Sequence, residues 1–104
     1  MVKVRGHRVE LDEVESVLSG HSGVSEAAAF TVPDGRGSVK ILAAVTLAKE
    51  AVTDEADILR FARKTLPGYA VPESVELLPR LPHNSSGKIN RKLLAEQWMA
   101  EQKA

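Results

Sequence analysis

The sequence contains no cysteine, and only 4% of its 104 residues are aromatic. The absence of cysteine excludes disulfide bonds, zinc sites built from thiolates, and catalysis by a thiol. No apolar run approaches the roughly 20 residues that a membrane-spanning helix needs, and residues 1–6 do not have the character of a signal peptide. We therefore expect a soluble, cytoplasmic protein.

The chain also lacks an excess of either charge, because 14 Lys and Arg side chains match 14 Asp and Glu side chains. A neutral chain is not expected to bind nucleic acid or an anionic membrane through general electrostatic attraction. Its 43% hydrophobic and 27% charged residues are typical of a globular protein. We expect residues 1–104 to form a single domain, and a domain of this size rarely encloses both a nucleotide and a second substrate.

Alternating apolar residues predict the strands. This pattern at residues 2–9 predicts a short two-stranded piece, and at residues 28–32 and 39–47 it predicts a hairpin. The turn of that hairpin falls in the segment Pro-Asp-Gly-Arg-Gly at residues 33–37. Residues 75–78 form a further short apolar segment, which we expect to pair with the hairpin as a third strand.

Helical spacing of apolar residues occurs in three other segments. The first begins at Leu11 and ends near Gly20, and the second begins near Asp54 and is expected to end at Pro67. The third is expected to start with Asn90 as its N-cap and to bury Trp98 as a core anchor. Together these segments predict an α+β domain, with a small three-stranded sheet, flanking helices and an N-terminal two-stranded piece.

The first candidate site is Lys88, which follows the small polar residues Ser85, Ser86 and Gly87. A lysine at the end of such a loop suits the stabilisation of negative charge on a phosphoryl or carboxylate oxygen. The loop is not a P-loop, because Pro82 stands where that motif needs its first glycine and no Ser or Thr follows the lysine. On composition alone, a solvated surface loop is the favoured interpretation.

The second candidate site lies at residues 3–10, where Gly6 stands between basic residues. A glycine there permits close approach of a ligand, and Lys3 and Arg8 offer positive charge. An ordinary turn with exposed charges is the alternative interpretation. The three histidines lie far apart in the sequence without carboxylates at metal-ligand spacing, and we expect no metal site.

Three segments together resemble the C-terminal domain of the adenylate-forming ligase superfamily, which includes acyl-CoA synthetases, non-ribosomal peptide adenylation domains and firefly luciferase. Residues 1–15 resemble the motif that follows the interdomain hinge. Residues 66–72, Leu-Pro-Gly-Tyr-Ala-Val-Pro, resemble the family's Leu-Pro-x-Tyr-x-x-Pro motif. Residues 81–93 resemble the terminal motif that carries the catalytic lysine. The resemblance extends from residue 1 to about residue 94.

The resemblance implies a role for each candidate residue. Lys88 matches the lysine that contacts the substrate carboxylate and the α-phosphate during acyl-adenylate formation, on a loop that includes Ser85, Ser86 and Gly87. Gly6 matches the glycine whose strand lines the pantetheine tunnel during thioester formation, and Lys3 and Arg8 match basic positions of the same face. In this family the domain rotates between the two half-reactions.

The resemblance also implies cofactors and partners. ATP and magnesium are expected to bind mainly to a large N-terminal domain that this sequence lacks, and the isolated domain is expected to be inactive. The acceptor is phosphopantetheine on an acyl or peptidyl carrier protein, or CoA, and the motifs favour the carrier protein. We expect a domain excised just beyond the hinge rather than a free-standing lid subunit. The alternative function is a non-catalytic module that docks on a carrier protein or on a separate N-terminal domain.

Overall fold

The computed structural model describes residues 1–103 of the chain. Its centre is a three-stranded sheet made of β3 (Val24–Pro33), β4 (Val39–Leu47) and β5 (Val75–Leu77), in that order. β3 and β4 form the predicted antiparallel hairpin, and β5 joins β4 in parallel. The predicted α+β class and the three-stranded sheet are both confirmed.

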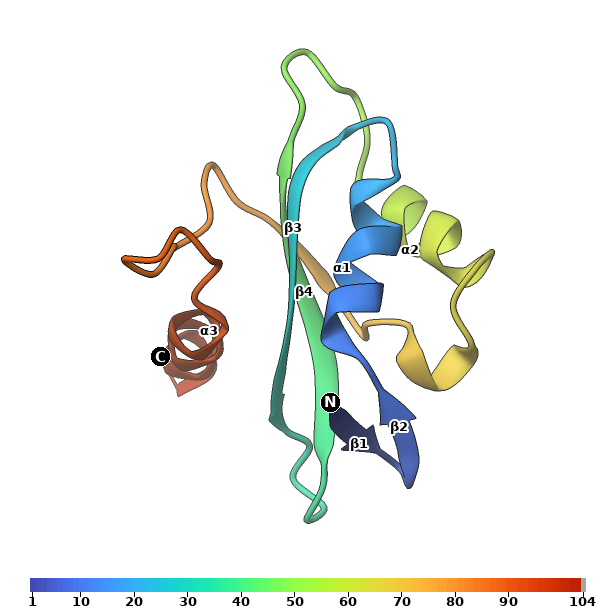
Figure 1. The fold of residues 1–104 in the computed structure, drawn as a ribbon, viewed down its shortest axis with the longest axis vertical. Coiled ribbons are helices and arrows are strands. Elements are labelled where there is room, and N and C mark those ends of the chain that lie inside the picture. The colour runs from blue at the N-terminus through green and yellow to red at the C-terminus, as the bar shows by residue number, and fades with distance from the viewer. Residues whose placement is uncertain (104) are drawn as a thin grey trace.

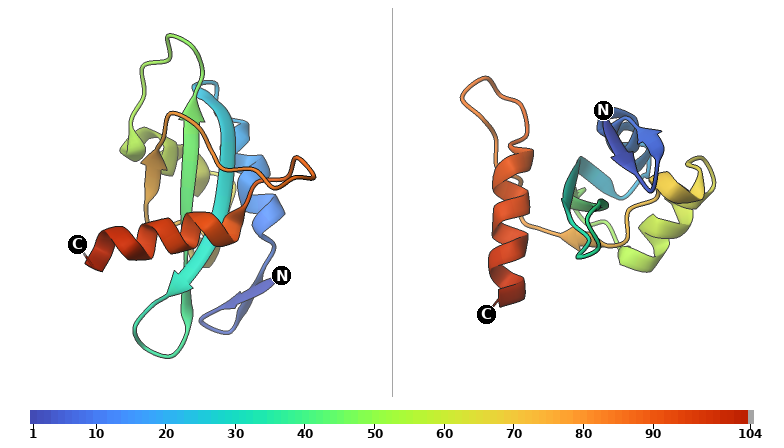
Figure 2. Two further views of the ribbon diagram at one scale, coloured as in Figure 1. Left: turned by 90° about the vertical axis from the view of Figure 1, so that its left-hand side faces the viewer. Right: turned by 90° about the horizontal axis from the view of Figure 1, so that it is seen from below.

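Three helices and a small hairpin surround this sheet. β1 (Val2–Val4) pairs antiparallel with β2 (His7–Val9), as the sequence predicts. α1 (Leu11–Ser19) and α2 (Glu55–Arg63) cover one face of the sheet, and α3 (Arg91–Lys103) lies alone across the other face (Figure 1 and Figure 2). The β1–β2 hairpin lies at one end of the molecule, on the side of α1 and α2 (Figure 1).

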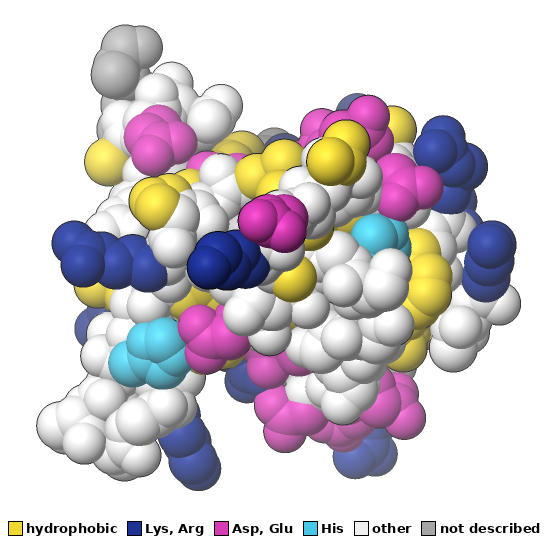
Figure 3. Space-filling view, turned by 90° about the horizontal axis from the view of Figure 1, so that it is seen from above, with side chains coloured by type: hydrophobic (Ala, Val, Ile, Leu, Met, Phe, Trp, Pro, Cys, Tyr) yellow, Lys and Arg dark blue, Asp and Glu magenta, His cyan; other side chains and the backbone are white. Residues whose placement is uncertain are grey.

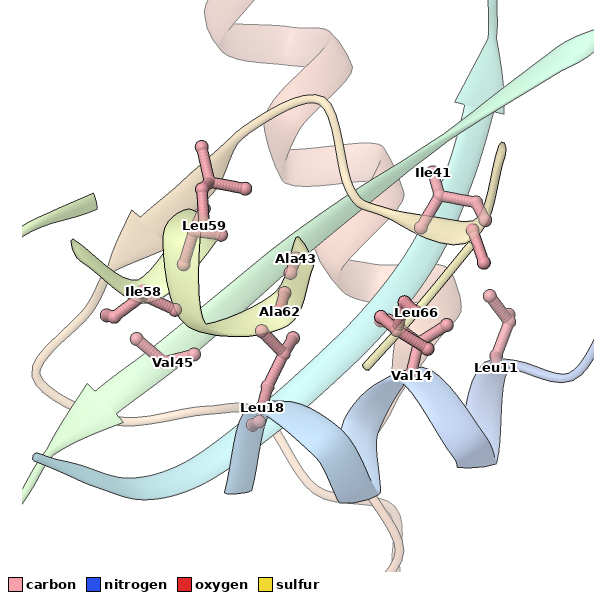
Figure 4. Packing of buried hydrophobic residues seen from close by; sticks show 14 of the residues in the cluster. Leu11, Val14, Leu18, Ile41, Ala43, Val45, Ile58, Leu59, Ala62 and Leu66 are labelled. Carbon is pink, nitrogen blue, oxygen red and sulfur yellow. The ribbon is translucent and has the colours of Figure 1, made fainter. Parts of the chain in front are cut away.

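The main hydrophobic core lies between the sheet and the two helices α1 and α2. Val14 and Leu18 of α1, Ile58 of α2 and Val45 of β4 are fully buried there (Figure 4). Val4 and Val9 add the β1–β2 hairpin to the same core. Burial of these apolar side chains, worth roughly 1.5–3 kcal/mol each, therefore fixes the hairpin against the body of the domain.

A second, smaller core lies under α3. Phe30 and Leu42 from the sheet are buried against Leu81 and Leu94. Trp98 packs against this cluster but remains partly exposed, with the Lys40 ammonium 5.2 Å from its ring centroid. Since β3 and β4 are covered on both faces, their sequences are apolar at nearly every position and do not alternate strictly.

The helix ends follow from local chemistry. The Asn90 side chain accepts a hydrogen bond from the Leu93 N–H at 3.0 Å, which confirms the predicted N-cap of α3. α2 ends at Arg63, earlier than the predicted end at Pro67. Turn hydrogen bonds continue to Leu66, which is buried just beyond the helix. Because Leu66 keeps the helical spacing of apolar residues, the sequence predicts a helix that is too long. Among the described residues, no helix has both the length and the apolar character that a membrane crossing requires.

Candidate functional site

Lys88 lies in a short loop that precedes α3, next to the base of the loop, and we refer to residues 83–89 as the Lys88 loop. His83 and Ile89 form an antiparallel bridge at its base. The Asn84 N–H donates to the Lys88 carbonyl at 2.6 Å, and the Gly87 N–H donates to the Asn84 carbonyl at 2.9 Å. The side chain of Lys88 is exposed, as are those of the two predicted supporting serines. The backbone thus presents an exposed ammonium on an ordered loop.

Gly87 has a backbone requirement that explains its place before the lysine. Its φ is +87°, in the left-handed region that glycine adopts with little cost. A Cβ at this position would meet no atom within 4 Å, so the requirement is conformational and not steric packing. The glycine therefore sets the direction in which the chain enters Lys88.

Arg91, the first residue of α3, connects the Lys88 loop to α1. Its guanidinium donates from Nε to Glu15 Oε2 at 3.0 Å and from Nη2 to Asp12 Oδ1 at 2.6 Å. Nη2 also lies 2.9 Å from Glu15 Oε1, which makes the pair with Glu15 bidentate. Asp12 and Glu15 of α1 thus pair with a residue of the terminal motif.

The charges of this cluster are mutually stabilising. The hydrogen bond and positive charge of Arg91 hold the pKa of Asp12 below its usual value, with a smaller contribution from the Lys88 ammonium. The hydrogen bonds from Arg91 to Glu15 and then to Asp12 raise the pKa of Arg91.

The second predicted site is the β1–β2 hairpin, which we call the Gly6 hairpin. Its two turn residues, Arg5 and Gly6, have φ values of +51° and +83°, as a two-residue type I′ turn requires. Lys3 and Arg8 are cross-strand partners and are both exposed. Arg8 also forms an exposed ion pair with Glu10 at 3.3 Å. The three predicted residues of this site therefore lie on one small exposed surface.

A stacked pair of rings joins the Gly6 hairpin to the Leu-Pro-Gly-Tyr motif. The His7 and Tyr69 ring centroids are 4.0 Å apart and the planes are 10° from parallel. Tyr69 belongs to the short 3₁₀ helix η1 (Gly68–Ala70) that follows α2. A groove of about 410 Å³ lies beside this contact, with Arg5, Arg36 and Tyr69 in its wall. No pattern in the sequence predicts this contact.

The two predicted sites do not form one pocket. The Gly6 hairpin contributes Val4 and Val9 to the core under α1 and α2, whereas the Lys88 loop leads into α3 on the other face of the sheet (Figure 2). Lys and Arg side chains are interspersed with Asp and Glu on the face in Figure 3, without a region of one sign. Among residues 1–103, no three His, Asp or Glu side chains converge as a metal site.

Comparison with known proteins identifies the family. The model of the AMP-binding enzyme C-terminal domain matches residues 13–88. Tyrocidine synthase 3 of Brevibacillus parabrevis is 36% identical over 91% of this chain, and the long-chain-fatty-acid–CoA ligase of Salmonella typhimurium is 39% identical over 93%. The crystal structure of apo MatB from Rhodopseudomonas palustris superposes on 93% of the chain with a TM-score of 0.86 and 31% identity.

The chain belongs to the family of AMP-binding enzyme C-terminal domains, which are part of adenylate-forming ligases. It spans a small part of its relatives: 1% of tyrocidine synthase 3, 17% of the fatty-acid ligase and 19% of the MatB chain. The relatives include both CoA ligases and peptide synthetases, so membership by itself leaves the acid and the acceptor undetermined.

Proposed function

We propose that this chain is the mobile C-terminal lid, a single domain, of a cytoplasmic ATP-dependent ligase that activates an acid as its adenylate. The observation that carries the proposal is the position of Lys88, which is exposed on a loop that backbone hydrogen bonds hold in shape. An ammonium presented in this way serves an active site that another domain completes. The proposed partner is the N-terminal adenylation domain that binds ATP and the acid.

In the first half-reaction, a carboxylate oxygen of the acid attacks the α-phosphorus of ATP. The new P–O bond gives the acyl-adenylate, and the bond to pyrophosphate breaks. Negative charge increases on the phosphoryl oxygens and on the leaving pyrophosphate, where the Lys88 ammonium stabilises it. The loop formed with Ser85, Ser86 and Gly87 holds that ammonium in place, which lowers the entropic cost of reaching the reacting atoms.

In the second half-reaction, a thiolate attacks the acyl carbonyl carbon and AMP leaves, so that a thioester forms. We propose that the Gly6 hairpin faces the active site in this step, after rotation of the domain. Gly6 presents bare backbone to the pantetheine arm, since a Cβ there would meet no atom within 4 Å of this domain. Lys3 and Arg8 supply positive charge beside the path of the acceptor.

The proposal also covers the acceptor of the acyl group and the place where magnesium binds. We favour phosphopantetheine on an acyl or peptidyl carrier protein over free CoA, because the motifs around Gly6 and Lys88 are similar to those of peptide synthetases. Magnesium would accompany ATP on the adenylation domain, since the described residues of this chain do not form a metal site. No step proposed for this domain depends on a metal that it holds.

The test is pyrophosphate release by the complete ligase carrying Lys88→Ala, with Lys92→Ala as the matched control. Lys92 is an exposed residue of α3 that we give no role. We expect Lys88→Ala to lower the rate of adenylation by roughly two orders of magnitude or more, and ATP binding to stay within about threefold. Unchanged pyrophosphate release in Lys88→Ala would leave the alternative, a docking module without a catalytic role.

A further inference from the structure

Glu15 connects three parts of the molecule that lie far apart in the sequence. Its carboxylate accepts a hydrogen bond from the backbone N–H of Ala29 at 2.8 Å and pairs with both Nε and Nη2 of Arg91. Ala29 lies in β3, at the edge of the sheet, and Arg91 opens α3. Only 18% of the Glu15 side chain is exposed, so these contacts are shielded from water more than a surface ion pair is.

A continuous series of contacts runs from Glu15 to the catalytic lysine. Arg91 follows Lys88 by three residues, and between them the Asn90 N–H donates to the Pro82 carbonyl at 2.8 Å. Ile89 bridges to His83 across the base of the Lys88 loop. Each link is short and hydrogen-bonded, so the carboxylate of Glu15 fixes the end of the loop relative to the sheet.

The Lys88 loop requires such a support for a physical reason. Most of its residues are exposed. His83 lies 3.0 Å from the Glu26 carboxylate in an exposed pair, and Ile89 at the base is only partly buried against the smaller core. A lid that arrives at its active site by rotation must bring its lysine already positioned, because a displacement of about 1 Å costs up to 100-fold in rate. Without the bidentate pair, Arg91 and the preceding loop would lose their connection to α1.

We infer that Glu15 is a positioning residue for adenylation, which acts through Arg91 to hold Lys88 in its productive place. This inference rests on the proposed function, because it assigns a role to Glu15 only if Lys88 is the adenylation lysine. Glu15 does not touch the substrate. Its effect should fall on the half-reaction that uses Lys88 and not on thioester formation, which uses the Gly6 hairpin.

The experiment measures both half-reactions of the complete ligase with Glu15→Gln, Arg91→Gln and Arg91→Lys. Glutamine at position 15 keeps an oxygen for the Ala29 N–H but loses the charge and the second acceptor for Arg91. Lysine at position 91 keeps one charge but loses the bidentate geometry. Glu13→Gln is the matched control, because Glu13 is exposed on the same helix.

We expect Glu15→Gln and Arg91→Gln to lower the kcat of adenylation by about 10-fold or more, with Arg91→Lys intermediate. KM for ATP, and the rate of thioester formation from synthetic acyl-adenylate, should stay within about twofold of the Glu13→Gln values. Equal losses in both half-reactions would show a general structural role and overturn the inference. Unchanged adenylation in all three variants would also overturn it.

Two of the variants separate failure of folding, and failure of the proposed function, from failure of the positioning role. If Glu15→Gln fails to fold, by its circular dichroism melting curve, Arg91→Lys decides the outcome, since it is the smaller perturbation. Lys88→Ala is run in parallel. Loss of adenylation in Lys88→Ala together with full activity of the position 15 and 91 variants rejects the positioning role alone. Full activity of Lys88→Ala rejects the proposed function and the positioning role with it.

Discussion

His7 stacks on Tyr69 with the two ring centroids 4.0 Å apart. His7 begins β2 in the first family motif, and Tyr69 lies in η1 in the second motif. The contact holds the Gly6 hairpin against the connector that follows α2. Two motifs that are separate in the sequence therefore form one continuous surface, next to the groove that includes Arg5.

The stack predicts an energetic coupling between the two rings. A double-mutant cycle with His7→Ala and Tyr69→Ala should give a coupling energy of about 0.5–1.5 kcal/mol in the free energy of unfolding, measured by urea titration. The matched control pairs Tyr69→Ala with His21→Ala, because the His21 ring packs against Phe61 instead. Additive effects in both cycles would show that the stack contributes nothing to stability.

The left-handed backbone at Gly87 predicts a cost for any side chain there. Gly87→Ala should lower the free energy of unfolding by about 1–2 kcal/mol, because an L-residue resists a φ of +87°. Gly87→Asn should cost less, since asparagine tolerates this region better. The control is Gly68→Ala, where an added Cβ meets no atom within 4 Å and the change should stay within about 0.5 kcal/mol. Equal effects at both glycines would contradict the backbone argument.

The lowered pKa of Asp57 predicts that part of the free energy of unfolding depends on pH. Hydrogen bonds from His21 and then from Thr53 lower the pKa of its carboxyl. A lowered pKa stabilises the folded state fully above the ordinary aspartate pKa, and this stabilisation is lost as the pH falls through the lower folded-state pKa. Urea unfolding of the wild type and of Asp57→Asn, from about pH 6 to about pH 3, should show a smaller loss of stability in the variant. Parallel pH profiles would contradict this.

The elements of the fold were predictable because each carries its own local signal. The apolar residues of β4 and the turn residues before it predict the hairpin, and Asn90 predicts the start of α3. The end of α2 was predicted too late, because a buried Leu66 continues the helical spacing after the hydrogen-bonded helix has ended. The spacing of apolar residues indicates which side chains are buried, and buried side chains can continue beyond the last residue of a helix.

The candidate site was predictable only in part. Lys88 and Gly6 stand out because their family motifs are contiguous, so their sequence neighbours identify them. The contact between two of those motifs joins residues far apart in the sequence: Arg91 of the terminal motif meets Glu15 of the first motif across 76 positions. No periodicity or spacing rule pairs an acidic residue of α1 with the first residue of α3. Only the packing of the two helices around the sheet brings these residues together.

In the proposed function, one domain serves two half-reactions with two different surfaces. The most direct test compares Lys88→Ala with Gly6→Val in the complete ligase, measuring adenylation by pyrophosphate release and thioester formation from synthetic acyl-adenylate. We predict opposite specificities: Lys88→Ala should lose adenylation by roughly 100-fold or more and keep thioester formation, and Gly6→Val should do the reverse. Loss of the same half-reaction in both variants would show that the two surfaces do not serve separate steps.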